Sequence, residues 1–324
     1  RDGFNADGNV VIKSGKIKIE AGEEGFDVGG TLTLEAGEID ITSFGDVFSV
    51  SGDINITKGN FNLKSTSGED DGMDSGGSIR IIGGTFQIEA GKDAISADFD
   101  ILIEDKNIYT EFYINAGSDA LDAGERILIE NGLYFISAGN DGIKGNDIEI
   151  NGGEIHAESI AETLDVKNSL NIGFRGNVNL MSAESSAIYA REQANVVISG
   201  IVTAVGADNS EDEILGAGIW CESGNFIITD ALFIAVGEIN TPPDPELSNQ
   251  CTVVLGEAEA GSVISIRSNT EKIRCFTAPK HYKNMLLSDP RLRLNEKYDV
   301  YVDGEYTLSF EINSMVTKIN GTPK

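Results

Sequence analysis

The sequence predicts an all-β protein, folded as a right-handed parallel β-helix of about ten coils with three short strands per coil and a C-terminal β cap. Three observations support this prediction. A short motif recurs about every 22 residues, two runs of alternating apolar and polar residues follow each copy, and a glycine turn separates those runs. Because the alternation has a period of two and no stretch shows the period of a helix, each run is expected to be a strand.

The repeated motif is an acidic residue, then Gly or Ala, an apolar residue, any residue and a small residue, as in residues 2–6. If one repeat forms one coil, the apolar residues at the centre of the motif stack into a buried column. Longer steps between copies fall at inserts in residues 65–69, 105–110 and 207–213. The expected core column consists of Phe4, Phe26, Phe48, Met73, Ile95, Leu121, Ile143, Leu164, Ile188 and Ile219.

Each motif is followed by a second strand, such as Val10–Ile12 or Ile79–Ile81. A glycine turn comes next, as at Gly15, because glycine tolerates the positive φ that tight turns require. The third strand alternates as well, as in Lys16–Ile19 and Thr85–Ile88. Three short strands per repeat fit one solenoid coil, which hydrogen-bonds to its neighbours at a distance of about 4.8 Å.

The repeat stops near residue 240. Residues 1–240 are therefore expected to form the β-helix, and residues 241–324 a cap of β-strands with a hairpin packed on its end. The dipeptide Asp303-Gly304 predicts the hairpin turn between strands Tyr298–Val302 and Tyr306–Phe310. Such a cap would cover strand edges that the last coil otherwise leaves unpaired.

The chain of 324 residues is strongly acidic, with 24 Lys and Arg against 53 Asp and Glu and a formal net charge of −29. Phosphate binding requires a basic face, so the composition argues against nucleic acid as a partner and disfavours anionic membranes. The imbalance favours multivalent cations as partners, or simply a solubilising surface. No apolar run is long enough to span a membrane, and a monomer is expected.

Stacking would also arrange the motif's acids in columns, because acids recur two residues before the core position and one residue after it. Like charges about 5 Å apart repel by about 3 kcal/mol at an effective dielectric constant near 20, so the columns need protonation, solvent or cations. Oxygen-only clusters suit Ca²⁺. Alternatively, the acids form turns by accepting backbone N–H groups and need no metal. The candidate calcium ligands are Glu24, Asp27, Asp46, Asp71, Asp74, Asp93, Asp119, Asp122, Asp141, Glu162 and Asp165, centred on Asp71, Asp74, Asp93, Asp119 and Asp122.

Lys144 interrupts the outward acidic column. It is a weak candidate for a catalytic base that abstracts a proton next to a uronate carboxylate. The simpler interpretation is that it neutralises its acidic neighbours, which would raise its pKa. Further along the same column, Tyr189 and Trp220 either stack on sugar rings or are buried beneath the cap.

Few other side chains suggest chemistry. The histidines, His156 and His281, have no partner constellation and are expected to be structural or surface residues. Cys251 and Cys275 either form a disulfide or remain free together with Cys221, and the sequence leaves both alternatives open.

The repeated turn, the Ile-x-Ile strands and the C-terminal residues 276–280, 286–288 and 298–304 resemble a family of bacterial surface carbohydrate-binding β-helix proteins. The resemblance implies an extracellular or cell-surface protein, its signal peptide removed, that binds cell-wall polysaccharide, including acidic pectic chains such as polygalacturonate, with Ca²⁺ in its coils. The family is similar in fold to calcium-dependent pectate lyases. This sequence departs from the lyase pattern, because Lys144 is isolated and no arginine is recognised beside it.

Three functions follow. The leading hypothesis is a non-catalytic, calcium-dependent protein that binds acidic or cellulosic polysaccharide, with Ca²⁺ bridging carboxylates of protein and polymer. The second is a polysaccharide lyase with Lys144 as its base. The third is a structural or adhesive surface solenoid whose charge is merely solvated.

Overall fold

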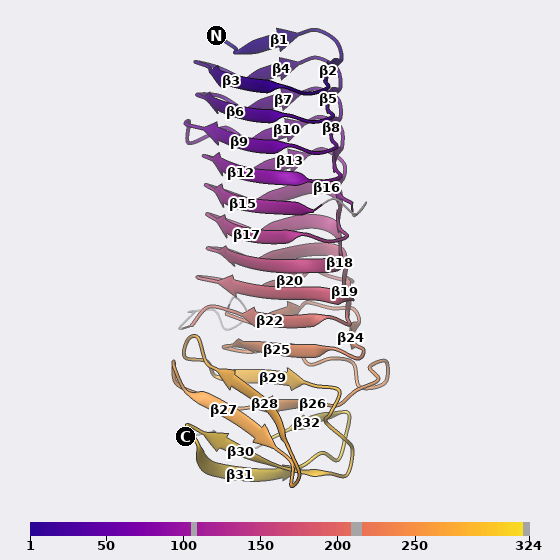
Figure 1. The fold of residues 1–324 in the computed structure, drawn as a ribbon. Helices are drawn as coiled ribbons and strands as arrows, with labels where there is room; N and C mark the ends of the chain where they lie inside the picture. Colours follow the sequence, from indigo (N-terminus) through magenta and orange to yellow (C-terminus); the bar gives the residue numbers. More distant parts are fainter. Residues whose placement is uncertain (105–108, 209–215, 320–324) are drawn as a thin grey trace.

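The protein, seen in a computed structural model that describes residues 1–104, 109–208 and 216–319, is an elongated solenoid of parallel strands with further strands at its C-terminal end (Figure 1). The predicted β-helix is confirmed, with about nine turns. The predicted inserts at residues 105–110 and 207–213 fall mostly outside the described residues.

The motif forms the first strand of each coil. Successive copies pair in parallel and in register, as Phe4 pairs with Phe26 and Asp74 with Ser96. The first strands are β1 (Phe4–Ala6), β4 (Phe26–Val28), β7 (Phe48–Val50), β10 (Met73–Ser75), β13 (Ile95–Ala97), β20 (Ile188–Ala190), β23 (Ile219–Cys221) and the beginnings of β16 (Leu121–Ile129), β18 (Ile143–Ser159) and β19 (Leu164–Ser182).

The second and third strands stack in the same way, and β18 and β19 each run through all three positions. The separate second strands are β2 (Val10–Ile12), β5 (Leu32–Leu34), β8 (Ile54–Ile56), β11 (Ile79–Ile81), β14 (Ile101–Ile103), β21 (Asn195–Ile198) and β24 (Phe226–Ile228). The separate third strands are β3 (Lys16–Glu20), β6 (Glu38–Ser43), β9 (Asn60–Ser65), β12 (Gly84–Ala90), β15 (Thr110–Ala116), β17 (Leu133–Ala138), β22 (Ile201–Val205) and β25 (Leu232–Gly237).

The apolar sides of the three strand columns share one core. Inside it, the rings of Phe61, Phe86, Phe112 and Tyr134 stack with centroids 4.7, 4.5 and 5.2 Å apart. Each such pair contributes about 0.5–1.5 kcal/mol beyond the burial of its area. Phe4, in the first coil of the given sequence, is 41% exposed and pairs with a neighbouring coil on one side only.

The turn between the second and third strands requires glycine for two reasons. Gly37 has a φ of +147°, a conformation that other residues rarely adopt. A Cβ atom at Gly37 would also lie 3.0 Å from the carbonyl oxygen of Gly15 in the preceding coil. The close stacking of these turns therefore selects glycine in coil after coil.

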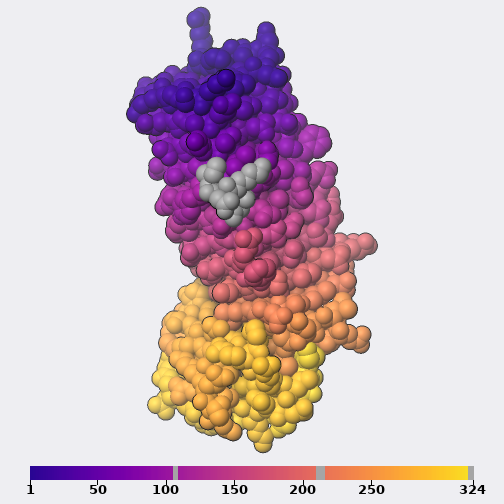
Figure 2. All heavy atoms as spheres, turned by 45° about the vertical axis from the view of Figure 1, so that its right-hand side comes forward, coloured from indigo at the N-terminus to yellow at the C-terminus, as the bar shows by residue number. Residues whose placement is uncertain are grey.

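Strands at the C-terminal end continue the stack and then leave it. β29 (Asn284–Ser288) pairs antiparallel with β25 and with β26 (Thr252–Leu255), which also pairs with β32 (Val316–Lys318). A separate antiparallel sheet has the order β28 (Lys272–Thr277), β27 (Val263–Arg267), β30 (Lys297–Val302), β31 (Glu305–Glu311). Figure 2 shows these orange and yellow residues packed against the end of the solenoid.

Side chains of residues 240–250 cover much of the edge of the last coil. Asn240 accepts the N–H of Ile219, and Gln250 accepts the N–H of Ala231. Polar side chains here replace a neighbouring strand as hydrogen-bond partners, which blunts an exposed edge. All three cysteines are free thiols, so of the two alternatives left open by the sequence the structure has the one without a disulfide.

Candidate functional site

The predicted outward column forms one continuous row on the first strands. Within it, every aspartate is flanked by a serine, an asparagine, a lysine or a tyrosine rather than by another acid, so the nearest carboxylates are two coils apart. The row runs Asn5, Asp27, Ser49, Asp74, Ser96, Asp122, Lys144, Asp165, Tyr189, Trp220.

The second predicted column, two residues before the core position, forms a ladder of hydrogen bonds. Oδ1 of Asp71 accepts the N–H of Asp93 at 2.8 Å, and Oδ1 of Asp93 accepts the N–H of Asp119 at 2.9 Å. The same bond links Asp46 to Asp71, Asp119 to Asp141 and Asp141 to Glu162. Asp71, Asp93, Asp119 and Asp141 are buried, so they satisfy backbone donors that would otherwise have no partner.

Basic side chains compensate part of this buried charge. Lys92 Nζ lies 3.0 Å from Asp71 and 3.6 Å from Asp93. Lys144 Nζ lies 2.8 Å from Asp119 and 3.1 Å from Asp122.

Two ladder acids illustrate the other form of relief. Burial raises the pKa of Asp46 to about 6. Burial, reinforced by the negative charge of Asp119, raises the pKa of Asp141 to about 8. Asp141 can therefore hold a proton near neutral pH, and Asp46 in mildly acidic solution, which removes charge from the ladder.

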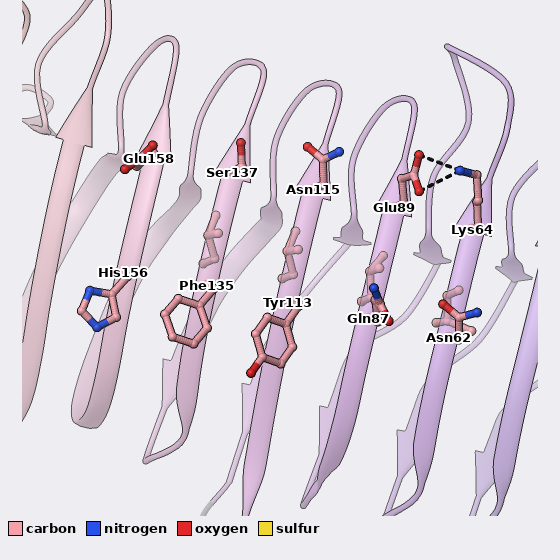
Figure 3. A pocket seen from close by; sticks show the side chains of 14 residues that line it. Asn62, Lys64, Gln87, Glu89, Tyr113, Asn115, Phe135, Ser137, His156 and Glu158 are labelled. Atoms are coloured by element: carbon pink, nitrogen blue, oxygen red, sulfur yellow. Dashed lines mark hydrogen bonds and ion pairs between the residues drawn. The ribbon is translucent and has the colours of Figure 1, made fainter.

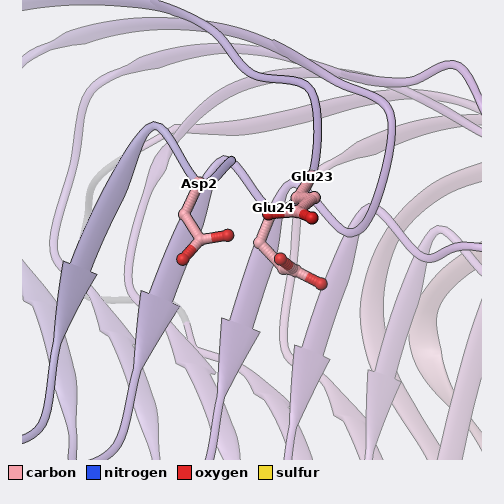
Figure 4. Close-up of side chains that lie close together, drawn as sticks. All are labelled: Asp2, Glu23 and Glu24. Atoms are coloured by element: carbon pink, nitrogen blue, oxygen red, sulfur yellow. The ribbon is translucent and has the colours of Figure 1, made fainter.

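This arrangement bears on the expected calcium site. Around Asp71, Asp93, Asp119 and Asp122 the oxygens already receive ammonium groups and backbone N–H groups, so a Ca²⁺ ion would have to displace Lys92 or Lys144. The first two coils hold another group of carboxylates, and there the N-terminal ammonium lies 3.0 Å from Glu23 Oε2. Among the residues that the structure describes, Asp2, Glu23 and Glu24 are the acids that bring three carboxylate oxygens within 4.8 Å of one another (Figure 4).

Lys144 is positioned as a counter-ion rather than as a base. Burial alone would lower its pKa, but the hydrogen bonds to Asp119 and Asp122 outweigh burial and hold the pKa well above its ordinary value. The structure also places Arg191 on the same hollow of about 230 Å³ as Lys144, an arginine that the sequence reasoning did not recognise. Arg191 is itself paired with Asp165 through both of its oxygens.

Tyr189 and Trp220 pair in register and are partly exposed. The hydroxyl of Tyr189 donates to Glu222, and the guanidinium of Arg191 lies over its ring, 5.3 Å from the centroid. A cation therefore already occupies one face of the Tyr189 ring.

A different surface carries the more accessible aromatic row. The outward sides of the third strands β9, β12, β15, β17 and β18 line an open groove with a volume of about 500 Å³ (Figure 3). Tyr113, Phe135 and His156 pair in register and occupy the last three of its five strands. Tyr113 is 43% exposed and Phe135 is 39% exposed. Both are large rings on the outward side of the strands.

These rings overlap only slightly. The centroids of Tyr113 and Phe135 are 5.3 Å apart with an interplanar angle of 14°, and those of Phe135 and His156 are 5.3 Å apart at 9°. Parallel rings in contact are separated by about 3.5 Å, so their centres must be displaced sideways by about 4 Å, which is more than the width of a ring. Each ring therefore leaves much of one face uncovered.

Polar groups surround the rings. The hydroxyl of Tyr113 donates to Glu111 at 2.5 Å, and His156 Nε2 lies 2.9 Å from Glu154. Figure 3 shows a second row of side chains beside the rings, from the next outward position of each strand. That row is Lys64, Glu89, Asn115, Ser137 and Glu158.

The spacing of the motif does not predict this groove, because the motif forms the first strands and the groove lies on the third strands. The alternation of the third strands predicted only that they are strands. The signal was present: the aromatic residues Tyr113 and Phe135 and the ring of His156 occupy equivalent outward positions in three consecutive repeats.

Within the described ranges, no helix has both the length and the apolar character needed to cross a bilayer. No curated protein and no solved structure matches the chain. The family model described as carbohydrate-binding domain-containing protein matches residues 1–159. Those residues include every residue that lines the groove. Residues 1–159, somewhat less than half of the chain, are therefore similar to carbohydrate-binding domain-containing proteins.

Proposed function

We propose that the protein is a non-catalytic polysaccharide-binding protein and that the polymer binds in the groove on the third strands. The observation that carries this proposal is the row of exposed rings at Tyr113, Phe135 and His156, within the family-matched part of the chain. The C–H groups on the flat side of a sugar ring carry partial positive charge, and the face of an aromatic ring is its negative side. The amide and hydroxyl groups beside the rings can hydrogen-bond sugar hydroxyls.

Binding to insoluble polysaccharides tests this proposal. The double variant Tyr113→Ala/Phe135→Ala removes two partly exposed rings. At about 0.5–1.5 kcal/mol for each aromatic contact, it should weaken binding by about five- to 150-fold. Phe174→Ala is the matched control, because Phe174 is 80% exposed and lies outside the groove. Equal retention of the double variant and wild type would place the polymer elsewhere.

Calcium-dependent binding of an acidic polymer such as polygalacturonate is a second proposal, supported by the carboxylates of Asp2, Glu23 and Glu24, where a Ca²⁺ ion would replace the N-terminal ammonium that contacts Glu23. Two acidic polymers repel, and a shared Ca²⁺ ion would provide the attraction. Retention on polygalacturonate should then disappear with EGTA and in Glu23→Gln/Glu24→Gln. Retention that survives both treatments would remove this proposal.

Absence of catalysis is part of the proposal, because a Lys144 held in its protonated form cannot accept a proton. Incubation with uronate polymers should release no unsaturated product that absorbs in the ultraviolet. Release that is lost in Lys144→Ala would instead establish a lyase.

We also propose that the protein acts outside the cell or at the cell surface, where cell-wall polysaccharide is found. Fractionation of the producing cells, with detection by antibody, tests this location.

A further inference from the structure

We infer that the groove holds an uncharged, extended polysaccharide along the axis of the solenoid, with one sugar residue per coil, and that the C-terminal segment 276–280 extends this binding surface. The inference rests on the proposed function and adds the direction, the register and the charge class of the ligand.

The direction follows from how the groove is built. Its lining residues come from equivalent positions of successive third strands, so the groove crosses the strands and runs along the solenoid axis (Figure 3). Two parallel rows of side chains follow that direction. One row contains the rings and begins at Asn62 and Gln87, and the other begins at Lys64 and Glu89. A polymer lying across the axis would contact only one or two rings.

The register follows from spacing. Neighbouring coils are separated by about 4.8 Å, and the ring centroids by 5.3 Å. One sugar residue in an extended chain has a similar length. Each coil can therefore offer one sugar a ring or amide from the first row and a hydrogen-bonding group from the second. Because the two spacings are similar, successive sugars can lie over successive coils without distortion of the polysaccharide or of the protein.

The charge class follows from the lining. Lys64 Nζ contacts both oxygens of Glu89 at 2.8 Å, so the two charges compensate each other. Glu158 adds a negative charge, and Gln87, Asn115 and Ser137 are neutral. Among the described residues that line the groove itself, the only lysine or arginine is Lys64, which is held in an ion pair, on a chain whose net charge is −29. Lys280, in an adjoining hollow, donates to a backbone carbonyl oxygen. An uncharged polymer avoids this repulsion.

The binding surface does not end at His156. The ring row continues in register through Asn179 to Thr203. Two smaller hollows, of about 270 and 280 Å³, share Glu158 and Met181 with each other and adjoin the groove. Phe276, Pro279 and Lys280 of the C-terminal segment line these hollows. Lys280 Nζ donates to the carbonyl oxygen of Ser182 at 2.6 Å, which fastens the segment to the solenoid.

A length series of uncharged oligosaccharides tests the inference. Isothermal titration of the whole protein with cello-oligosaccharides and xylo-oligosaccharides of two to eight residues should show Kd falling with each added residue up to about six. The expected gain is roughly two- to tenfold for each residue that meets a ring. High salt should leave Kd unchanged, because no ion pair with the ligand is involved.

Two variants locate the contacts. Phe135→Ala should weaken binding of oligomers of three or more residues by roughly two- to tenfold. Lys280→Ala should affect only the longest oligomers. Phe174→Ala should affect none, and thermal melting of each variant checks that it is folded.

Three outcomes would overturn the inference. A plateau at two or three residues would mean that the chain lies across the groove. Tighter binding of uronate oligomers than of neutral ones would contradict the charge class. Loss of binding in Lys280→Ala for every length would make that residue structural. None of these three outcomes affects the proposed function if binding to insoluble polysaccharide still depends on Tyr113 and Phe135. If binding depends on neither ring, the proposed function and the further inference are both refuted.

Discussion

Replacement of Asp119 tests whether the buried acid column is a structural ladder. Its Oδ1 accepts the N–H of Asp141 at 2.9 Å and an amide N–H of Asn140, and its Oδ2 lies 2.8 Å from Lys144 Nζ. Asp119→Ala removes all three contacts. Asp119→Asn keeps an oxygen for the backbone N–H and removes the charge, so the pair separates hydrogen bonding from charge.

The two substitutions should differ in cost. In Asp119→Ala the N–H of Asp141 is left buried without an acceptor, which costs about 1–3 kcal/mol. Loss of the pair with Lys144 adds less than about 1 kcal/mol, because the lysine is 38% exposed. The total is about 1–4 kcal/mol. Asp119→Asn should cost about 1 kcal/mol or less, since removing its charge also relieves repulsion with Asp122 and Asp141.

Thermal unfolding followed by circular dichroism measures the difference. A chain of this length has an unfolding entropy that converts 1 kcal/mol into about 1.5 °C. Asp119→Ala should therefore lower Tm by about 1.5–6 °C, and Asp119→Asn by a smaller amount, about 1.5 °C or less. If the two variants lost the same amount, charge rather than the backbone bond would hold the column, and the ladder argument would fail.

Three further predictions concern pH, calcium and the single tryptophan. The pKa of Asp141 is raised to about 8 in the folded protein and is near 3.9 when unfolded, so its contribution to stability is complete below about pH 4 and is lost as pH rises to about 8. Tm should therefore rise as pH is lowered from about 8 to about 5, and Asp141→Asn should flatten that dependence; an unchanged slope in the variant would refute the assignment. Added Ca²⁺ should raise Tm, because a ligand of the folded state stabilises it, and Glu23→Gln/Glu24→Gln should abolish the shift; a wild-type Tm that ignores Ca²⁺ would count against bound calcium. Trp220 lies on the first strands, away from the groove, so its fluorescence should not change when oligosaccharide binds; a saturable change would move the site to the first strands.

The repeat alone was sufficient to predict the coils. Apolar residues spaced by one repeat, such as Phe26 and Phe48, pair in register because a solenoid converts sequence distance into a fixed rise. The same reasoning aligned the outward acids correctly. The spacing of the motif therefore determined the architecture and the columns.

The chemistry of those columns required the tertiary structure. Whether a carboxylate such as Asp93 faces solvent, a metal ion or a backbone N–H depends on side-chain direction within a turn, and spacing does not encode this direction. The pairing of Lys144 with two acids of the preceding coil has the same origin. The sequence therefore did not decide whether the acid columns bind Ca²⁺ or accept backbone N–H groups.

The groove shows most clearly which features the sequence determined and which required the tertiary structure. The sequence places Tyr113, Phe135 and His156 at equivalent outward positions of three repeats, and one-repeat stacking makes them a row. Only the folded chain determines that their faces stay uncovered, that Lys64 and Glu89 neutralise each other beside them, and that residues 276–280 return to the end of the row. The physical reason is that local spacing fixes contacts between neighbouring coils, whereas concavity, charge pairing and the approach of a distant segment depend on the packing of the whole chain.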